Sequence, residues 1–187
     1  MSWVLANLPT IAGHLLAHLL QAVPAIVASF VLAIPIARLA RVARPLRAVL
    51  VTGSSLLYAV PSLALFVILP IILDTGIRDT LNVIVALTLY GLALLVPATV
   101  DALDAVDARV LDAATAMGMG RLRCFLTVEL PLAGPAILTG LRVVTVSTIS
   151  LTTVGAVLGV RSLGWLFTDG FQRGITAEIV TGLVATA

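Results

Sequence analysis

Long runs of apolar residues dominate this 187-residue chain, and short polar segments separate them. A helix rises about 1.5 Å per residue, so about 20 apolar residues are needed to cross the roughly 30 Å hydrocarbon core of a bilayer. Four stretches reach that length, at approximately 15–39, 48–73, 81–100 and 135–158. The pattern therefore predicts an all-α chain whose helices span a membrane.

Two positions modify this simple pattern. Pro61 lies at the middle of the second stretch, and proline removes a backbone donor and clashes with the preceding turn, so a break is expected near Val60. A fifth apolar stretch occupies 179–187 and is too short to cross a membrane as a helix. We therefore expect a single transmembrane domain over 1–187 with about five spans, the last one incomplete in this chain.

The composition supports a membrane location. Apolar residues make up 60% of the chain and charged residues 11%, with a mean hydropathy of +1.18. Soluble domains carry about 25% charged residues because most of their surface faces water. The net charge of +2 does not suggest a nucleic-acid partner. We expect a multi-pass protein of the bacterial plasma membrane, surrounded by the lipid bilayer.

The arginines, which are the only basic residues besides the two histidines, predict the orientation. Seven lie between the first and second or the third and fourth stretches: Arg38, Arg41, Arg44, Arg47, Arg109, Arg121 and Arg123. Three lie on the opposite side: Arg78, Arg161 and Arg173. Positively charged loops remain in the cytoplasm, so the N-terminus is expected outside.

The segment 101–134, on the cytoplasmic side, has the densest polar pattern. Asp112-Ala113-Ala114 is followed after three residues by Gly118, and nine residues later come Val128 and, one further on, Leu130-Pro131. The Asp112 carboxylate favours the N-terminus of a helix near this residue, and Gly118 is suited to the C-terminal end of the same helix. Leu130-Pro131 is expected to begin the next helix, because proline fixes its own φ.

This spacing resembles the EAA loop of ATP-binding cassette (ABC) importer permeases. The family pattern is Glu-Ala-Ala, three residues, Gly, nine residues, an aliphatic residue, one residue and Leu-Pro; Asp112 replaces the Glu and Val128 the common Ile. The segments AVPSLALFVILP (59–70) and VGAVLGVRSLGWL (154–166) resemble permeases of osmoprotectant uptake systems, although Arg161 and Ser162 replace part of a glycine run. The resemblance covers most of the chain after the first span.

The resemblance implies a type I ABC importer permease-like bundle that acts as a transport subunit and not as an enzyme. The implied partners are a cytoplasmic ABC ATPase dimer, a second permease subunit and an extracytoplasmic substrate-binding protein, with ATP and Mg²⁺ on the ATPase and no cofactor in this chain. The implied solute is glycine betaine, choline, carnitine or proline; the alternative is another small solute such as an amino acid. The residues implied to couple to the ATPase are Asp112, Ala113, Ala114, Gly118, Val128, Leu130 and Pro131.

Polar residues inside the spans indicate a candidate translocation path, since a broken helix near the midplane often lines a substrate site. The candidates are Ser55, Tyr58, Pro61, Ser62 and Tyr90. Hydroxyl residues also enrich the fourth stretch: Thr145, Ser147, Thr148, Ser150, Thr152 and Thr153. The competing interpretation is that these hydroxyls bond their own helix or a neighbour.

Other patterns are weaker. His14 and His18 are four residues apart, a spacing that can hold a metal, but no third ligand is evident, and polar residues near the outer interface are the favoured interpretation. Gly118, Gly120 and Arg121 lack the GK[ST] of a phosphate loop. A multi-span channel or scaffold without an ATPase would share the hydropathy and topology, but would not explain the spacing of the 101–134 segment.

Overall fold

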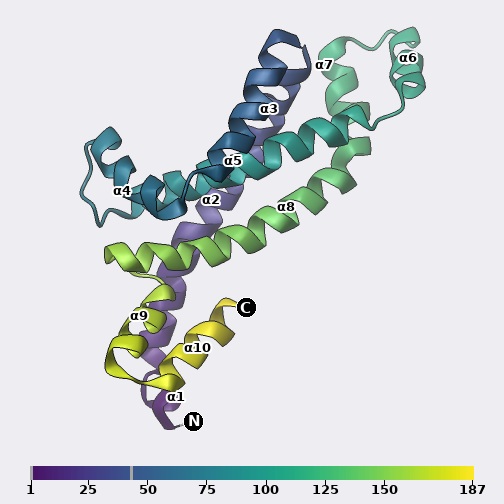
Figure 1. The fold of residues 1–187 in the computed structure, drawn as a ribbon. Coiled ribbons are helices and arrows are strands. Elements are labelled where there is room, and N and C mark those ends of the chain that lie inside the picture. The colour runs from purple at the N-terminus through teal and green to yellow at the C-terminus, as the bar shows by residue number, and fades with distance from the viewer. Residues whose placement is uncertain (1, 43) are drawn as a thin grey trace.

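The computed structural model describes residues 2–42 and 44–187, and the described part is helical throughout, without a β-strand. Three long helices, α2, α5 and α8, cross one another, and the shorter helices gather at their two ends (Figure 1). In chain order the elements are α1 (Ser2–Ala6), α2 (Leu8–Val42), α3 (Arg44–Ala59), α4 (Ser62–Leu73), α5 (Thr80–Asp104), α6 (Ala108–Ala116), α7 (Arg121–Cys124), the π-helical turn η1 (Phe125–Glu129), α8 (Leu130–Thr152), the 3₁₀ turn η2 (Thr153–Leu158), α9 (Gly164–Arg173) and α10 (Thr176–Thr186).

Helix α2 packs on α5 through a stripe of small residues. Its 35 residues cover about 52 Å, more than the bilayer core. The buried small residues of this stripe recur every three or four positions: Ala22, Ala25, Ser29, Ala33, Ala37 and Ala40. Small side chains let two backbones approach closely, which is how helices associate in lipid, where the hydrophobic effect supplies no attraction.

The second apolar stretch is two helices and not one straight span. Helices α3 and α4 meet at an angle of 109°, with the break at Val60 and Pro61, where the proline led us to expect it. Pro61 has φ −57° and ψ 128°, which is an extended conformation that no α-helix continues through. Neither helix alone is long enough for a full crossing, so the pair turns within the bundle, and α4 lies against α5.

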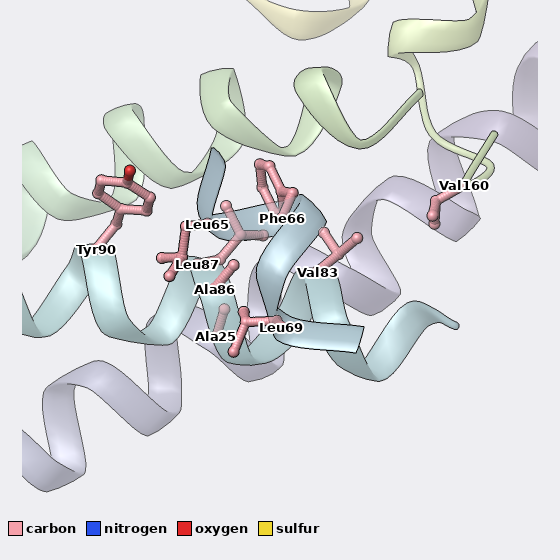
Figure 2. Close-up of a cluster of buried hydrophobic side chains, with 9 residues drawn as sticks. All are labelled: Ala25, Leu65, Phe66, Leu69, Val83, Ala86, Leu87, Tyr90 and Val160. Carbon is pink, nitrogen blue, oxygen red and sulfur yellow. The ribbon is translucent and has the colours of Figure 1, made fainter. Parts of the chain in front are cut away.

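A compact apolar cluster holds α4 in this position. Leu65, Phe66 and Leu69 of α4 pack on α5 residues of the same cluster (Figure 2). The full set is Ala25, Leu65, Phe66, Leu69, Val83, Ala86, Leu87, Tyr90 and Val160. The cluster joins α4 to α2, α5 and the segment after η2. Contacts with these three parts of the chain therefore hold the helix that follows the Pro61 break.

The fourth expected span begins earlier than its apolar pattern. Elements α7, η1, α8 and η2 form one continuous rod of 38 residues, Arg121–Leu158, so α8 begins at Leu130 as predicted but continues directly from the helical turns before it. Residues 121–129 include three charged side chains, Arg121, Arg123 and Glu129, which make this segment less apolar than a span. They do not end the helix, because charged side chains at the end of a helix can reach water. The Leu130 N–H donates to the Phe125 carbonyl, and this wider π turn makes room for the Pro131 ring.

Helices α9 and α10 form a hairpin beside α1 at the end of α2 that carries the N-terminus (Figure 1). Helix α10 begins at Thr176 and covers about 16 Å, roughly half of a bilayer core. Three helices of the described residues are long and apolar enough to span a membrane, and the bent α3–α4 pair is a fourth candidate. The count of five, with an incomplete last span, stays a prediction.

Candidate functional site

A chamber opens beside the Pro61 break. It has a volume of about 520 Å³ and lies among α3, α4, α5 and α8. Its lining residues are Tyr58, Val60, Ser62, Tyr90, Val146, Ser147, Ser150 and Leu151. The lining is apolar with a few hydroxyls and two aromatic rings, which is the composition of a site for a small organic solute.

The two tyrosines of the chamber meet edge to face. Their ring centroids are 6.3 Å apart with an interplanar angle of 80°. The Tyr90 hydroxyl donates a hydrogen bond to the Val60 carbonyl, a group near the C-terminus of α3 that has no helical partner of its own. Tyr90 is buried, and its hydrogen bond holds the chain at the break. Tyr58 is half exposed, so its ring is accessible to a solute in the chamber.

The structure brings together three of the five predicted path residues, Tyr58, Ser62 and Tyr90. Ser55 does not line the chamber, because its hydroxyl donates to the Val51 carbonyl of its own helix at 3.0 Å. Pro61 shapes the break but is not among the lining residues. Thus the interpretation that a hydroxyl bonds its own helix holds for Ser55.

Helix α8 contributes lining residues that lie outside the five-residue candidate path, although two of them, Ser147 and Ser150, belong to the hydroxyl-rich set of the fourth stretch. Ser147 and Ser150 are three positions apart and face the chamber on one side of α8, together with Val146 and Leu151. The enrichment of hydroxyls in the fourth stretch was the available signal. It was not sufficient, because six candidate positions surround the helix and only packing decides which face the chamber.

At the opposite end, which the arginines predict to be cytoplasmic, α6 lies away from the bundle between α5 and the rod (Figure 1). It begins one turn earlier than predicted, because Asp107 caps it: the Asp107 carboxylate accepts the Arg109 backbone N–H at 2.9 Å. Asp112 is therefore in the middle of α6, exposed, and not at its N-terminus. The Arg109 guanidinium pairs with the Asp107 carboxylate at 2.7 Å. The pKa of Asp107 is lowered, mainly by the hydrogen bonds from this guanidinium and secondly by the hydrogen bond from the Arg109 backbone N–H.

Gly118 ends α6 as the sequence suggested. It has φ +82°, and its N–H donates to the Thr115 carbonyl at 2.9 Å while the Met119 N–H donates to the Ala114 carbonyl at 3.1 Å. This pair of bonds is a Schellman motif, which favours glycine at the left-handed position. Ala114 is buried, so it faces its own chain and not a partner, whereas Ala113 is exposed.

The remaining residues of the predicted coupling set lie on the rod. Val128 belongs to η1 and is half buried, and Leu130-Pro131 follow at the start of α8. Helix α6 contacts α7 and η1, so both halves of the motif share one cytoplasmic surface. Residues 105–120 connect α5 to the rod, and the cytoplasmic segment expected over 101–134 stays a prediction.

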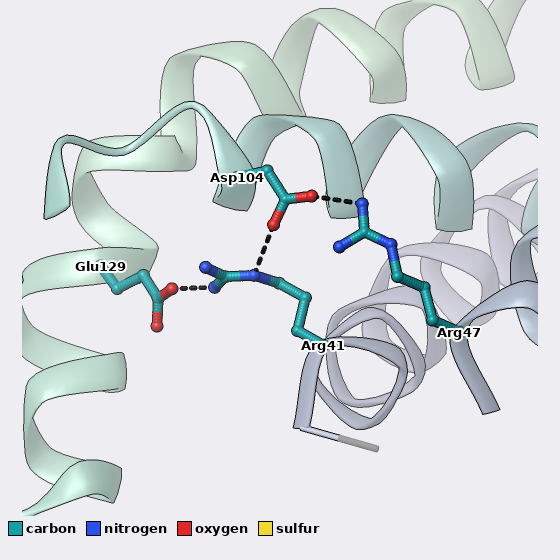
Figure 3. Close-up of polar contacts among 4 residues, drawn as sticks. All are labelled: Arg41, Arg47, Asp104 and Glu129. Atoms are coloured by element: carbon teal, nitrogen blue, oxygen red, sulfur yellow. Dashed lines mark hydrogen bonds and ion pairs between the residues drawn. The ribbon is translucent and has the colours of Figure 1, made fainter. Parts of the chain in front are cut away.

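An ion-pair network ties this surface to the bundle (Figure 3). Arg41, at the end of α2, pairs with Asp104 of α5 at 2.8 Å and with Glu129 of η1. Arg47 of α3 pairs with the second Asp104 oxygen at 2.5 Å. These ion pairs connect α2, α3, α5 and η1. The base of the rod is therefore linked directly to the ends of α2 and α5.

The chain matches a known family over most of its length. Residues 25–187 match the family described as the binding-protein-dependent transport system inner membrane component. The chain belongs to this family. The binding-protein-dependent permeases are membrane subunits of transport systems, so this chain is a transport subunit of the cell membrane, and the hypothesis of a scaffold or channel outside such a system is wrong.

Curated relatives of this chain are permeases of organic solutes. An ergothioneine transport permease/binding protein, EgtU of Helicobacter pylori, is 36% identical over 74% of this chain and 24% of that protein. The glycine betaine/carnitine/choline permease OpuCD of Bacillus subtilis is 29% identical over 91% of this chain and 73% of that protein. The chain thus spans about a quarter of the first relative and about three quarters of the second.

Solved structures show the same fold. The inward-facing MetNI methionine ABC transporter superposes with a TM-score of 0.81 and 20% identity, covering 94% of this chain and 87% of that chain. An amino acid ABC transporter with histidines gives 0.74 and 16%, covering 98% and 92%. The chain therefore has the type I ABC importer permease fold that its sequence suggested.

Proposed function

We propose that this permease imports a small osmoprotectant, either a quaternary ammonium solute such as glycine betaine, choline or carnitine, or the amino acid proline. The observation that carries the proposal is the chamber beside Pro61, where the Tyr58 ring is exposed next to a helix end and a few hydroxyls. A quaternary cation has no N–H to donate and is held by aromatic faces and by the negative ends of helices. OpuCD, which shares 29% of its aligned residues, is named for such solutes.

Transport is proposed to follow alternating access driven by a separate ATPase dimer. The exposed face of α6, with Asp112 and Ala113, docks on the ATPase, which holds ATP and Mg²⁺. Movement of α6 reaches the rod through α7 and η1, and reaches α2 and α5 through Arg41. A second permease subunit completes the pathway, and an extracytoplasmic binding protein delivers the solute.

A second candidate is another small solute, such as an amino acid other than proline. The solved structures with this fold are titled as methionine and amino acid transporters, although at 16–20% identity they support the fold alone. The chamber volume of about 520 Å³ accepts either class.

The test is solute-stimulated ATPase activity of the complete complex in proteoliposomes, measured with its binding protein across glycine betaine, choline, carnitine, proline and methionine. Stimulation and uptake with one or more of the first four are expected. Stimulation by methionine alone would replace the proposal with the amino-acid alternative. Tyr58→Ala is expected to lower uptake of a quaternary solute about tenfold, since cation–π attraction reaches about 1–2 kcal/mol. Leu56→Ala, at an exposed neighbour on α3 that does not line the chamber, is the control.

The docking role of α6 needs its own variant. Ala113→Trp adds bulk on the exposed face and is expected to abolish co-purification of the ATPase while the permease stays folded. Ala48→Trp, an exposed alanine of α3, is the control and is expected to retain the ATPase. Ala114→Trp is unsuitable, because Ala114 is 2% exposed and its replacement would displace α6 itself. A fully coupled Ala113→Trp complex would show that α6 is not the docking element.

A further inference from the structure

A second pocket lies on the outer side of the bundle, between the α4–α5 loop, η2 and α9. Its volume is about 390 Å³. Its lining residues are Ile77, Arg78, Ala156, Val157, Leu158, Gly159, Trp165, Thr168, Asp169 and Gln172. Unlike the chamber beside Pro61, it contains charged side chains of both signs, one from the loop and one from α9.

Arg78 supplies the positive end of this pocket. Within residues 2–42 and 44–187 it forms no ion pair and no side-chain hydrogen bond, so its guanidinium donors are free. The arginine lies over the backbone of Gly159, where a Cβ would be 3.1 Å from Nε and 3.7 Å from the guanidinium carbon. Gly159 also has φ +80°, so the left-handed turn and the close approach of Arg78 both favour glycine there.

Helix α9 supplies the opposite end. Trp165, Asp169 and Gln172 are four and three positions apart, which places them on one face of α9. The Trp165 ring is stacked parallel to His14 at 6.1 Å, which orients the indole, and it remains 39% exposed. Asp169 pairs with Arg173 at 2.8 Å, and its side chain is 22% exposed, so one carboxylate beside an indole faces the pocket.

We propose that this pocket is an outer binding subsite for a small zwitterion. Arg78 would receive the solute carboxylate by charge-assisted hydrogen bonds, and Trp165 with Asp169 would receive its cationic end. A pocket lined by one cationic and one anionic side chain matches both ends of a zwitterion, whereas a simple cation gains nothing from Arg78. The proposal deepens the proposed function and rests on it, since it assigns a solute class to the same permease.

The outer pocket and the chamber lie along the same rod. Leu151 lines the chamber, whereas Ala156–Gly159 line the outer pocket. Val154, which lies between them, packs against the apolar cluster that contains Leu65 and Phe66. The rod changes from α to 3₁₀ geometry over this interval, Thr153–Leu158.

Arg78→Gln tests the subsite in the complete reconstituted complex with its binding protein. The expected result is a loss of glycine betaine uptake of about tenfold, because a hydrogen bond to a charged group is worth about 1.5–3 kcal/mol, with choline uptake retained since choline has no carboxylate. Arg78→Lys keeps the charge and is expected to restore most betaine uptake. Asp169→Asn and Trp165→Leu are expected to lower uptake of both solutes.

Arg161→Gln is the matched control, because Arg161 is an exposed arginine of the same side that does not line the pocket. Affinity for the binding protein is measured in parallel. Equal losses for betaine and choline with weaker binding-protein affinity would assign Arg78 to protein docking and overturn the subsite. Unchanged betaine uptake in Arg78→Gln, or a wild type that takes up choline but no zwitterion, would overturn it too. A wild type that transports none of these solutes instead contradicts the proposed function itself.

Discussion

The interior of the helix bundle and the cytoplasmic loop are built on opposite principles. Thirteen of the 25 residues of α5 are buried, and its contacts with α2 depend on small side chains that let the backbones meet. Only one of the nine residues of α6 is buried, and its ends are determined by Asp107 and Gly118, that is, by local hydrogen bonds. Substitutions in the bundle should therefore act through packing, and substitutions in the loop through helix ends and partner contacts.

The largest expected effect is at Gly91, where α5 meets α2. A Cβ at this position would lie 2.7 Å from the Ser29 Cβ, a clash that no rotation of the serine relieves. Gly91→Ala is expected to destabilise the bundle by about 1–3 kcal/mol, as overpacking does, and to lower the melting temperature of the detergent-solubilised protein. The double variant Gly91→Ala with Ser29→Gly should recover part of the stability, because the Ser29 side chain is gone while Val144 Cγ1 remains 3.2 Å from the new Cβ.

A glycine of α8 provides the control for Gly91. No atom lies within 4 Å of a Cβ at Gly134, so Gly134→Ala is expected to leave the melting temperature unchanged or raise it. If both alanine variants melted at the same temperature, close packing of α2 on α5 would not be what stabilises the interior.

The next largest effect is at Arg41, which connects the two regions. Arg41→Gln leaves Glu129, whose side chain is only 12% exposed, without its partner, and we expect a loss of about 1–2 kcal/mol after solvent screening. Solute-stimulated ATPase activity should fall further than the melting temperature indicates, because the base of the rod loses its link to α2. Arg47→Gln is the comparison: its pair with Asp104 is 46% and 34% exposed, so a change below about 1 kcal/mol is expected.

A substitution at Gly118 tests whether the end of α6 is independent of the stability of the bundle. Gly118→Ala forces an alanine to φ +82° and is expected to cost about 1 kcal/mol, confined to the end of α6, since no side chain lies within 4 Å. ATPase co-purification should weaken while the melting temperature of the bundle stays unchanged. Gly118→Asn should be milder, because asparagine tolerates the left-handed region; a bundle that melts earlier in Gly118→Ala would show that the loop also stabilises the membrane part.

The smallest effect is the pH dependence of the start of α6. Arg109 lowers the pKa of Asp107, so the contribution of this cap to the loop is complete above the ordinary carboxyl pKa and is lost as the pH falls through the lowered value. Hydrogen exchange at the Arg109 amide should therefore show protection that persists below the ordinary carboxyl range. Asp107→Asn, which can still cap the helix, should remove this pH dependence without removing the cap.

Several features were predictable because they follow from short-range properties. Pro61 has no backbone N–H and its ring disfavours the preceding helical turn, so a break there was predictable, although Pro24, Pro35 and Pro97 remain inside helices. Gly118 tolerates the left-handed conformation that ends α6, and the spacing from Asp112 to Pro131 led to the family that the comparison then showed. By contrast, Asp112 was misplaced, since Asp107 was an equally good cap one turn earlier.

The sequence by itself indicated that the chain crosses a membrane and where its second apolar stretch breaks, while the cytoplasmic location of 101–134 stays a prediction. Each of these depends on hydropathy, charge or the covalent geometry of a few neighbouring residues. Only the tertiary structure decided the 109° turn at Pro61, the burial of Ala114 and the pairing of Arg41 with Asp104, which is 63 residues away. It also decided that Arg78 and Asp169 share a pocket. These outcomes depend on contacts between distant segments, which no local pattern encodes.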